Sequence, residues 1–302
     1  MYRRLALAFF WLFYIHSCLS AIEKSNQQKF LYEISIATVF KDEAPYFKEW
    51  IEYHKLLGVQ HFRLYNNDST DDFLKVLEPY IKSGEVQVID WPGGHGDWCN
   101  KVQGLAMLDA MSNLKGISKW LAIIDVDEFI LPKIGNLIAF LSDYEAFGGV
   151  VINWQNYGTS WVQDLPPGKL LIETLTLKAE EQSWWNEQVK SIVQLDMVDS
   201  TKHDWRLPHQ WLYLKGYSGV APNMKPFVYG KIDISKIRIN HYVHRTENYF
   251  YNHKLAKKAR MQEWPSPDFV ENWHKSCNKV EDKEIFRFVP IMRNKIFNLK
   301  TP

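Results

Sequence analysis

Short apolar runs alternate with amphipathic stretches along the first half of the chain. The apolar runs have the composition of buried strands, which we expect at 34–40, 61–65, 86–91 and 120–124. Between them, apolar residues recur every three to four positions, and we expect helices over 46–57, 72–82 and 99–114. Strands that alternate with helices in this way form right-handed βαβ units. The pattern predicts an α/β fold with a mixed, mostly parallel central sheet and helices on both faces.

The pattern becomes less regular after residue 150, and 155–185 is rich in loop-forming residues. We expect further strands at Val150–Trp154 and Val189–Leu195, and helices over 246–262 and 281–289. The sequence contains no internal repeat, no low-complexity tract and no clear linker. We therefore expect a single domain over 30–302.

The N-terminus has the features of a targeting segment. Two arginines precede an apolar run from Leu5 to Ile15, and small residues follow up to Ala21. As a helix the run would rise about 16 Å, roughly half of a bilayer core. Residues 1–21 are thus interpreted as a signal peptide or an uncleaved signal-anchor. Either interpretation predicts entry into the secretory or export pathway, and the second predicts membrane association through the N-terminus.

Composition narrows the class of protein only slightly. Lysine and arginine number 36 against 35 aspartates and glutamates, so the net charge of +1 gives no indication of nucleic acid as a partner. Aromatic residues make up 15%, and their rings suit flat polar ligands such as sugars as well as cores. Beyond the N-terminal segment, Cys99 and Cys277 lack the spacing of a zinc or redox motif. The sequence is consistent both with a disulfide between Cys99 and Cys277 and with two separate thiols.

Acidic residues follow the predicted strands. Asp125 and Asp127 come directly after the strand at 120–124, and polar clusters at 41–43 and 66–71 follow two others. Ligands of parallel sheets bind beyond the carboxyl ends of the strands. Strand alternation would send both aspartates to the same side, where their carboxylates could bind one Mg²⁺ or Mn²⁺. Such an ion neutralises a diphosphate leaving group.

Several motifs in order make the sequence resemble glycosyltransferase family 92 and, more distantly, the family 2-like transferases of the GT-A fold. The similarity covers roughly residues 34–260. The motifs are Phe40-Lys41-Asp42-Glu43, Glu49 to His54 with Gly58-Val59, Tyr65 to Asp71, Trp120 to Phe129, Trp154 with Tyr157 to Ser160, Lys190 to Val193, and Asn240-His241-Tyr242. Asp42 departs from the family pattern, in which Asn is more usual.

The resemblance implies a GT-A (Rossmann-like) catalytic domain over 30–302, with a nucleotide-sugar-binding half at 30–130 and an acceptor-binding half at 131–302. It implies an inverting, metal-dependent transferase that moves a sugar from a UDP-sugar to a glycan, glycolipid or glycoprotein acceptor. Galactose is one candidate sugar. Mn²⁺ or Mg²⁺ is the implied cofactor.

The resemblance also assigns roles to individual residues. Thr38, Glu43 and Asp68 would contact the nucleoside, although the cluster from Asp68 to Asp71 could equally be a capped turn. The implied diphosphate and metal ligands are Asp125, Asp127 and a late histidine, for which His209 and His241 are preferred over His203. Gln103, on the helix predicted over 99–114, is a candidate contact to the sugar or diphosphate.

Inversion requires a carboxylate base that deprotonates the acceptor hydroxyl. Asp204 is the first candidate, and Glu187 and Asp164 are alternatives. Two other classes of protein are consistent with the same residues. One is a non-catalytic carbohydrate- or surface-binding protein that keeps the fold, and the other is a metal-dependent phosphohydrolase that uses the same carboxylates.

Overall fold

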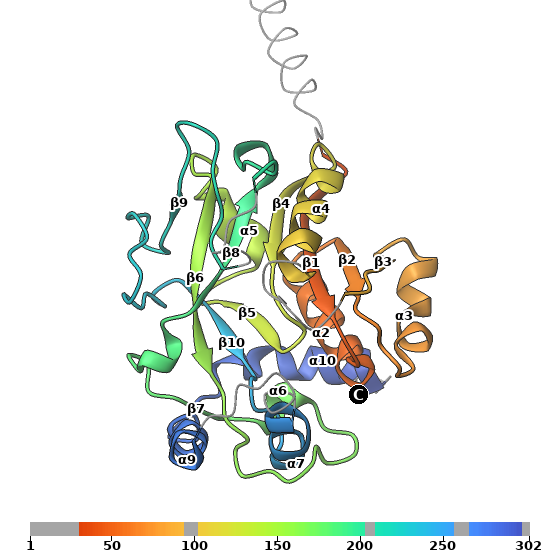
Figure 1. The fold of residues 1–302 in the computed structure, drawn as a ribbon, viewed down its shortest axis with the longest axis vertical. Helices are drawn as coiled ribbons and strands as arrows, with labels where there is room; N and C mark the ends of the chain where they lie inside the picture. Colours follow the sequence, from red (N-terminus) through yellow and green to blue (C-terminus); the bar gives the residue numbers. More distant parts are fainter. Residues whose placement is uncertain (1–29, 94–101, 203–208, 257–265, 298–302) are drawn as a thin grey trace, which may run out of the picture. The chain divides into compact units, whose positions relative to one another are not determined.

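The computed structural model describes residues 30–93, 102–202, 209–256 and 266–297 (Figure 1). The described residues from 32 onward form one compact unit. The predicted targeting segment at 1–21 lies outside the described residues, as does Cys99, whereas Cys277 is fully buried. No helix in the described ranges has both the length and the apolar character needed to span a bilayer.

A nine-stranded sheet runs through the described part of this unit, in the order β3-β2-β1-β4-β8-β6-β10-β5 with β9 paired to β6. The first four strands in this order are parallel neighbours. Their bounds are β1 (Tyr32–Phe40), β2 (His61–Asn66), β3 (Val86–Asp90) and β4 (Ser118–Ile123). The helices between them are α2 (Ala44–Leu56), α3 (Phe73–Lys82) and α4 (Leu105–Leu114). The predicted βαβ arrangement of the first half is confirmed.

The second half of the sheet is mixed. Its strands are β5 (Glu128–Pro132), β6 (Gly149–Asn156), β8 (Val189–Gln194), β9 (Gly219–Val220) and β10 (Ile237–His241). Strand β8 is antiparallel to β4 and β6, and β10 is parallel to β6 but antiparallel to β5. A small separate sheet pairs β7 (Leu177–Lys178) with β11 (Val280–Glu281). The predicted mixed, mostly parallel sheet is confirmed.

Helices pack on both faces of the sheet because side chains alternate along its strands. Ile36 and Phe40 of β1 belong to the large core that α2 and α3 complete, whereas Ala37 and Val39 pack in a second core with α4 (Figure 1). Trp50 of α2 is fully buried in the first core. The predicted α/β class with helices on both faces is thereby confirmed.

The helices of the second half differ from the prediction over 246–262 and 281–289. The first segment is a short turn of α-helix, α7 (Glu247–Tyr249), followed by a π-helical turn, η4 (Phe250–Lys254); the structure describes it only up to residue 256. The second is a 3₁₀ turn, η5 (Glu284–Phe288), that leads into α10 (Val289–Phe297). The remaining elements are α5 (Leu137–Ser142), α6 (Leu171–Thr174), η2 (Trp184–Asn186), η3 (Leu195–Met197) and α9 (Pro267–Ser276).

The chain order places a topological switch point between β1 and β4. From β1 the chain moves through β2 to β3 on one side, and it then returns to pair β4 with the other side of β1. Helices α2 and α4, which follow β1 and precede β4, pack on opposite faces. A crevice at the carboxyl ends of two such strands is the usual ligand site of an open α/β sheet.

Candidate functional site

A cleft of about 180 Å³ lies at this switch point, beyond the carboxyl ends of β1 and β4. We call it the charged cleft. It is lined by Glu43 after β1, by Asp125 and Asp127 after β4, by Gln103 before α4, and by Tyr249 and Lys254 from the α7–η4 segment. The sequence prediction that polar residues after β1 and β4 meet at one edge is therefore confirmed by the structure.

A turn, rather than strand alternation, positions the two aspartates. Strand β4 ends at Ile123, and the amide of Glu128 donates to the carbonyl of Asp125 at 3.0 Å. The amide of Asp125 donates in return to Oε2 of Glu128 at 3.1 Å. Both aspartates line one cleft as expected, but strand alternation is not the cause, because the extended backbone has already ended.

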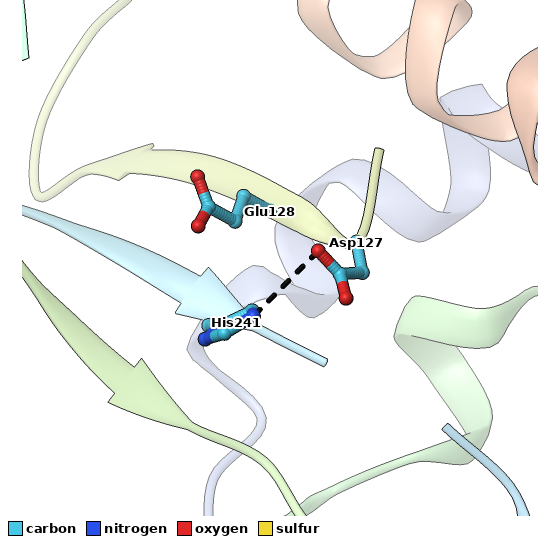
Figure 2. Close-up of side chains that lie close together, drawn as sticks. All are labelled: Asp127, Glu128 and His241. Atoms are coloured by element: carbon cyan, nitrogen blue, oxygen red, sulfur yellow. Dashed lines mark ion pairs between the residues drawn. The ribbon is translucent and has the colours of Figure 1, made fainter. Parts of the chain in front are cut away.

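Three side chains, Asp127, Glu128 and His241, form a group suited to a metal ion. Their ligand atoms all lie within 4.8 Å of one another (Figure 2). The antiparallel register of β5 and β10 places His241 directly opposite Glu128, and Nε2 of His241 lies 3.6 Å from Oδ1 of Asp127. Two oxygens and one imidazole nitrogen are a donor set that Mn²⁺ accepts readily, whereas Mg²⁺ prefers oxygen alone.

The electrostatics of this group also suit a cation. Burial raises the pKa of Glu128 well above its usual value, and its Oε1 has no hydrogen-bond partner among the described residues. Burial lowers the pKa of His241, which keeps the imidazole in the neutral form that binds metals. Burial would raise the pKa of Asp127, but His241 and the Lys254 charge together hold it below its usual range. A divalent cation would compensate the two buried carboxylates.

Asp125 is engaged differently from Asp127. Its Oδ2 lies 2.8 Å from Nζ of Lys190 on β8, and its Oδ1 accepts from Nε2 of Gln103 at 3.1 Å. Lys190 also lies 3.6 Å from Oε1 of Glu128 and is 1% exposed. Burial would lower the pKa of Lys190, but the charges of Asp125 and Glu128 raise it above its usual value. The lysine therefore carries a fixed positive charge at this end of the cleft.

Glu43 contacts a buried arginine. Its carboxylate lies 2.5 Å from Nη2 of Arg245, whose guanidinium carbon lies over the ring of Tyr46 at 3.7 Å and over that of Tyr249 at 4.5 Å. Burial raises the pKa of Glu43 to about 7, although Arg245 opposes the shift. Arg245 also has Nε and Nη1 atoms that are buried without a hydrogen-bond partner in the described part of the chain. The pair links the end of β1 to the segment after β10.

Neither of the other two residues that the resemblance assigned to the nucleoside lines the charged cleft. Thr38 is 1% exposed and donates to the carbonyl of Val39 at 3.4 Å. Asp68 is exposed and has a positive φ of 55°. In the same loop, Asp71 accepts from the amide of Ala44, the first residue of α2, at 2.7 Å. The nucleoside contacts of Thr38 and Asp68 stay predictions.

Of the two preferred late histidines, the structure brings His241 into the group in Figure 2. His209 instead donates from Nδ1 to the carbonyl of Val189 at 2.8 Å. Burial and the Lys190 charge lower its pKa to about 4. Its ring lies 5.7 Å from that of Trp154, which in turn lies 4.3 Å from the ring of His241.

The three residues predicted as candidates for the catalytic base differ in where they lie relative to the charged cleft. Asp204 lies outside the described residues, as does His203. Asp164 accepts from Nδ2 of Asn248 at 2.6 Å and is not among the residues that line the charged cleft. Glu187 lines a second hollow, of about 350 Å³, together with His241.

Sequence reasoning missed three parts of the site. In the sequence, Glu128 and Lys190 stand out only as members of the motifs Trp120 to Phe129 and Lys190 to Val193, and Arg245 lies outside all of the motifs. Strand β8 is buried throughout and contains a lysine. Because an unpaired buried ammonium is costly, a lysine in such an apolar strand indicates a buried acidic partner. No local pattern indicates that Arg245 pairs with Glu43.

An α/β domain with a strand-end cleft, a buried lysine and a carboxylate–imidazole group has the architecture of proteins that bind a ligand at a topological switch point. The comparison with known families is more specific. The chain belongs to glycosyltransferase family 92, whose family model matches residues 32–288. The protein is thus a member of a family of glycosyltransferases.

Curated relatives share modest identity with this chain. A glycosyltransferase family 92 protein of Ricinus communis is 26% identical over 88% of this chain and 42% of its own length. A galactan beta-1,4-galactosyltransferase of Arabidopsis thaliana is 31% identical over 33% of this chain and 21% of its own length. The chain spans about two-fifths of the length of the first of these relatives. Among solved structures, the TarS 1-349 structure of S. aureus has a TM-score of 0.36, with 12% identity over 89% of this chain and 75% of that one.

Proposed function

We propose that the protein is a metal-dependent glycosyltransferase that transfers a hexose from a UDP-sugar to a carbohydrate acceptor with inversion. The observation that carries the proposal is the position of the Asp127–Glu128–His241 group. It lies at the carboxyl ends of the strands, and Asp127 belongs both to this group and to the lining of the charged cleft. Membership of family 92 supports glycosyl transfer as the reaction.

The charged cleft offers groups of both signs to a nucleoside diphosphate. Lys254 lines the cleft and the buried Lys190 lies 2.8 Å from Asp125, so both supply positive charge near the aspartates. Glu43 and Gln103 supply hydrogen-bonding groups for the nucleoside or the sugar. A cleft with converging charges of this kind favours an anionic ligand that arrives with a cation.

Asp127, Glu128 and His241 would hold the cation. When bound, a divalent ion neutralises the charge that develops on a departing diphosphate. The unpartnered Oε1 of Glu128 and the neutral imidazole of His241 fit this role. Lys190 keeps Asp125 in place beside the group through its 2.8 Å contact.

Inversion requires a base on the side of the sugar opposite the leaving group. Glu187 lines the hollow that also contains His241, which makes it a candidate alongside Asp204. The name of the Arabidopsis relative, a galactan beta-1,4-galactosyltransferase, supports galactose as the first sugar to test. The predicted leader at 1–21 supports an acceptor that is met in the secretory pathway, in soluble form or at a membrane.

The experiment that tests the proposal measures UDP release by the full chain. UDP-galactose, UDP-glucose and UDP-N-acetylglucosamine would each be supplied with Mn²⁺, Mg²⁺ or EDTA, with and without carbohydrate acceptors. We expect cation-dependent release from one UDP-sugar and a loss of at least about 100-fold in the Asp127→Asn variant, because several kcal/mol of charge stabilisation disappear.

Asp143→Asn is the matched control, since Asp143 is exposed at the end of α5. It should retain full activity. A well-folded protein that responds to none of the nucleotide sugars would contradict the proposal and favour a carbohydrate-binding protein without turnover. Release of inorganic phosphate without an acceptor would favour a phosphohydrolase.

A further inference from the structure

His241, which lies 3.6 Å from Asp127 of the charged cleft, lines a second surface of different composition. The hollow of about 350 Å³ that contains His241 and Glu187 is lined mainly by aromatic rings, those of Trp154, Trp184, Trp185, Tyr229, Phe269 and Trp273. A neighbouring hollow of about 280 Å³ shares Trp184 and Trp185 with it. Because the two hollows share these rings, we treat them as one surface and call it the aromatic groove.

The aromatic groove comes from segments far apart in the sequence. Trp184 and Trp185 of η2 stack with ring centroids 3.8 Å apart, and Trp185 lies 5.9 Å from Trp273 of α9. Trp184 is 56% exposed and Tyr229 is 57% exposed. Large aromatic side chains grouped at a hollow and left open to solvent indicate a binding surface.

Polar groups at the groove lie where a ligand rich in hydroxyls could bond them. Glu187, Asn156 and Gln188 line the hollow beside His241. Nε1 of Trp154 and Nδ1 of His241 are buried without a hydrogen-bond partner in the described ranges. Rings that face C–H groups, together with a few carboxylate and amide groups, suit a sugar, which has an apolar face and a hydroxylated edge.

The charged residues of the groove limit the class of sugar that it can bind. Among the described residues that line the hollow beside His241, the carboxylate of Glu187 is present and no lysine or arginine is. A uronate or a phosphorylated sugar would meet Glu187 without a compensating cation there, and like charges at close range disfavour binding. In the second hollow Lys279 pairs with Glu180 at 3.4 Å, so its charge is compensated within the groove. The groove therefore suits neutral sugars.

We propose that the aromatic groove is the acceptor subsite and that it binds a neutral oligosaccharide, with one sugar unit stacked on the Trp184–Trp185 pair and the terminal unit beside His241. This inference rests on the proposed function, because the acceptor end must reach the donor at the charged cleft. The second hollow, lined by Ser183, Asn272 and Lys279 beside the shared tryptophans, extends the groove away from His241. The acceptor is therefore a chain of several sugars.

The test measures binding of oligosaccharides to the full chain by isothermal titration. The probes are neutral linear galacto- and gluco-oligosaccharides of two to six units, with oligogalacturonides of the same lengths. We expect one neutral series to bind more tightly as its length increases and the uronate series to bind at least about tenfold more weakly. Trp184→Ala and Tyr229→Ala should each weaken the neutral series about tenfold, since each removes an exposed stacking ring.

Trp161→Ala is the matched control, because Trp161 is also 56% exposed but lines neither hollow. It should bind the oligosaccharides as the wild type does. A parallel thermal shift with UDP and Mn²⁺ separates the two proposals. With that shift present, the inference is overturned if no neutral oligosaccharide binds or if the uronates bind equally well. It is also overturned if Trp161→Ala weakens binding as much as Trp184→Ala does. If the UDP shift itself is missing, the proposed function fails instead.

Discussion

The charged cleft, lined by Asp127, and the aromatic groove, lined by His241, are joined by the 3.6 Å contact between these two residues, yet the chain builds them in different ways. The charged cleft takes most of its polar groups from residues that directly follow β1 and β4, two adjacent parallel strands. The aromatic groove takes its rings from η2, β6, α9 and loop residues around 229. One region depends on regular pairing of neighbouring strands, whereas the other depends on contacts between segments that are distant in sequence.

This difference assigns distinct tasks to the two regions. Strand ends fixed by a buried sheet hold charged groups at constant separations, which suits a diphosphate and a cation. Loops and short helical turns carry the rings, and such segments can change without disturbing the sheet. We therefore expect substitutions in the cleft to affect stability and metal binding, and substitutions in the groove to affect acceptor binding.

The largest expected effect on stability comes from Lys190, which joins β8 to the charged cleft. Lys190→Met leaves the carboxylates of Asp125 and Glu128 without their cation, and Glu128 is fully buried. Removing one partner of a buried ion pair costs about 3–5 kcal/mol of unfolding free energy, and partly exposed Asp125 places the expected loss near the lower value. Urea denaturation measures this loss.

Lys119→Met provides the matched comparison. Lys119 pairs with Glu33 at 3.0 Å and Glu145 at 2.6 Å near the surface, where ion pairs contribute about 0–1 kcal/mol. Equal losses in the two variants would show that the cleft is not electrostatically distinct from the protein surface.

A pH-dependent effect, smaller over any single pH unit, comes from His54 of α2, which is fully buried. Burial lowers the pKa of His54 to about 3, and its ring donates to the carbonyl of Trp50 and accepts from the amide of Ile130. Between pH 6.5 and about 3 the unfolded chain binds a proton there that the folded chain does not. Stability from this group is therefore complete above pH 6.5 and falls by about 1.4 kcal/mol per pH unit below it.

The His54→Gln variant should show a shallower fall in unfolding free energy over that pH range, measured by urea denaturation at several pH values. His253→Gln, at an exposed position of η4, should follow the wild-type curve. Parallel curves for His54→Gln and the wild type would contradict the assignment.

The sequence predicts the regular region well for a physical reason. Strands β1 to β4 and helices α2 to α4 bury continuous apolar runs or one apolar face, so local pattern specifies them. The same pattern places Glu43, Asp125 and Asp127 at one edge of the sheet, since parallel neighbours share an edge. This part of the site can be read from local sequence.

Other parts of the site depend on pairing that local sequence does not encode. His241 faces Glu128 only because β10 lies antiparallel to β5, and these strands are separated by four others of the second half in the chain. Lys190 reaches Asp125 through the antiparallel pairing of β8 with β4. Trp184 and Trp185 lie in a stretch whose composition predicts a loop. The local sequence therefore does not predict the contact of Trp185 with Trp273.

The measurement that tests the central claim most directly is a titration of the full chain with Mn²⁺ in the presence of UDP, followed by electron paramagnetic resonance. The claim is that Asp127, Glu128 and His241 hold one divalent cation at the charged cleft. We predict one bound Mn²⁺ per chain, with affinity reduced at least tenfold in Asp127→Asn and His241→Gln and unchanged in His209→Gln. Loss of Mn²⁺ in His209→Gln with full binding in His241→Gln would contradict the claim.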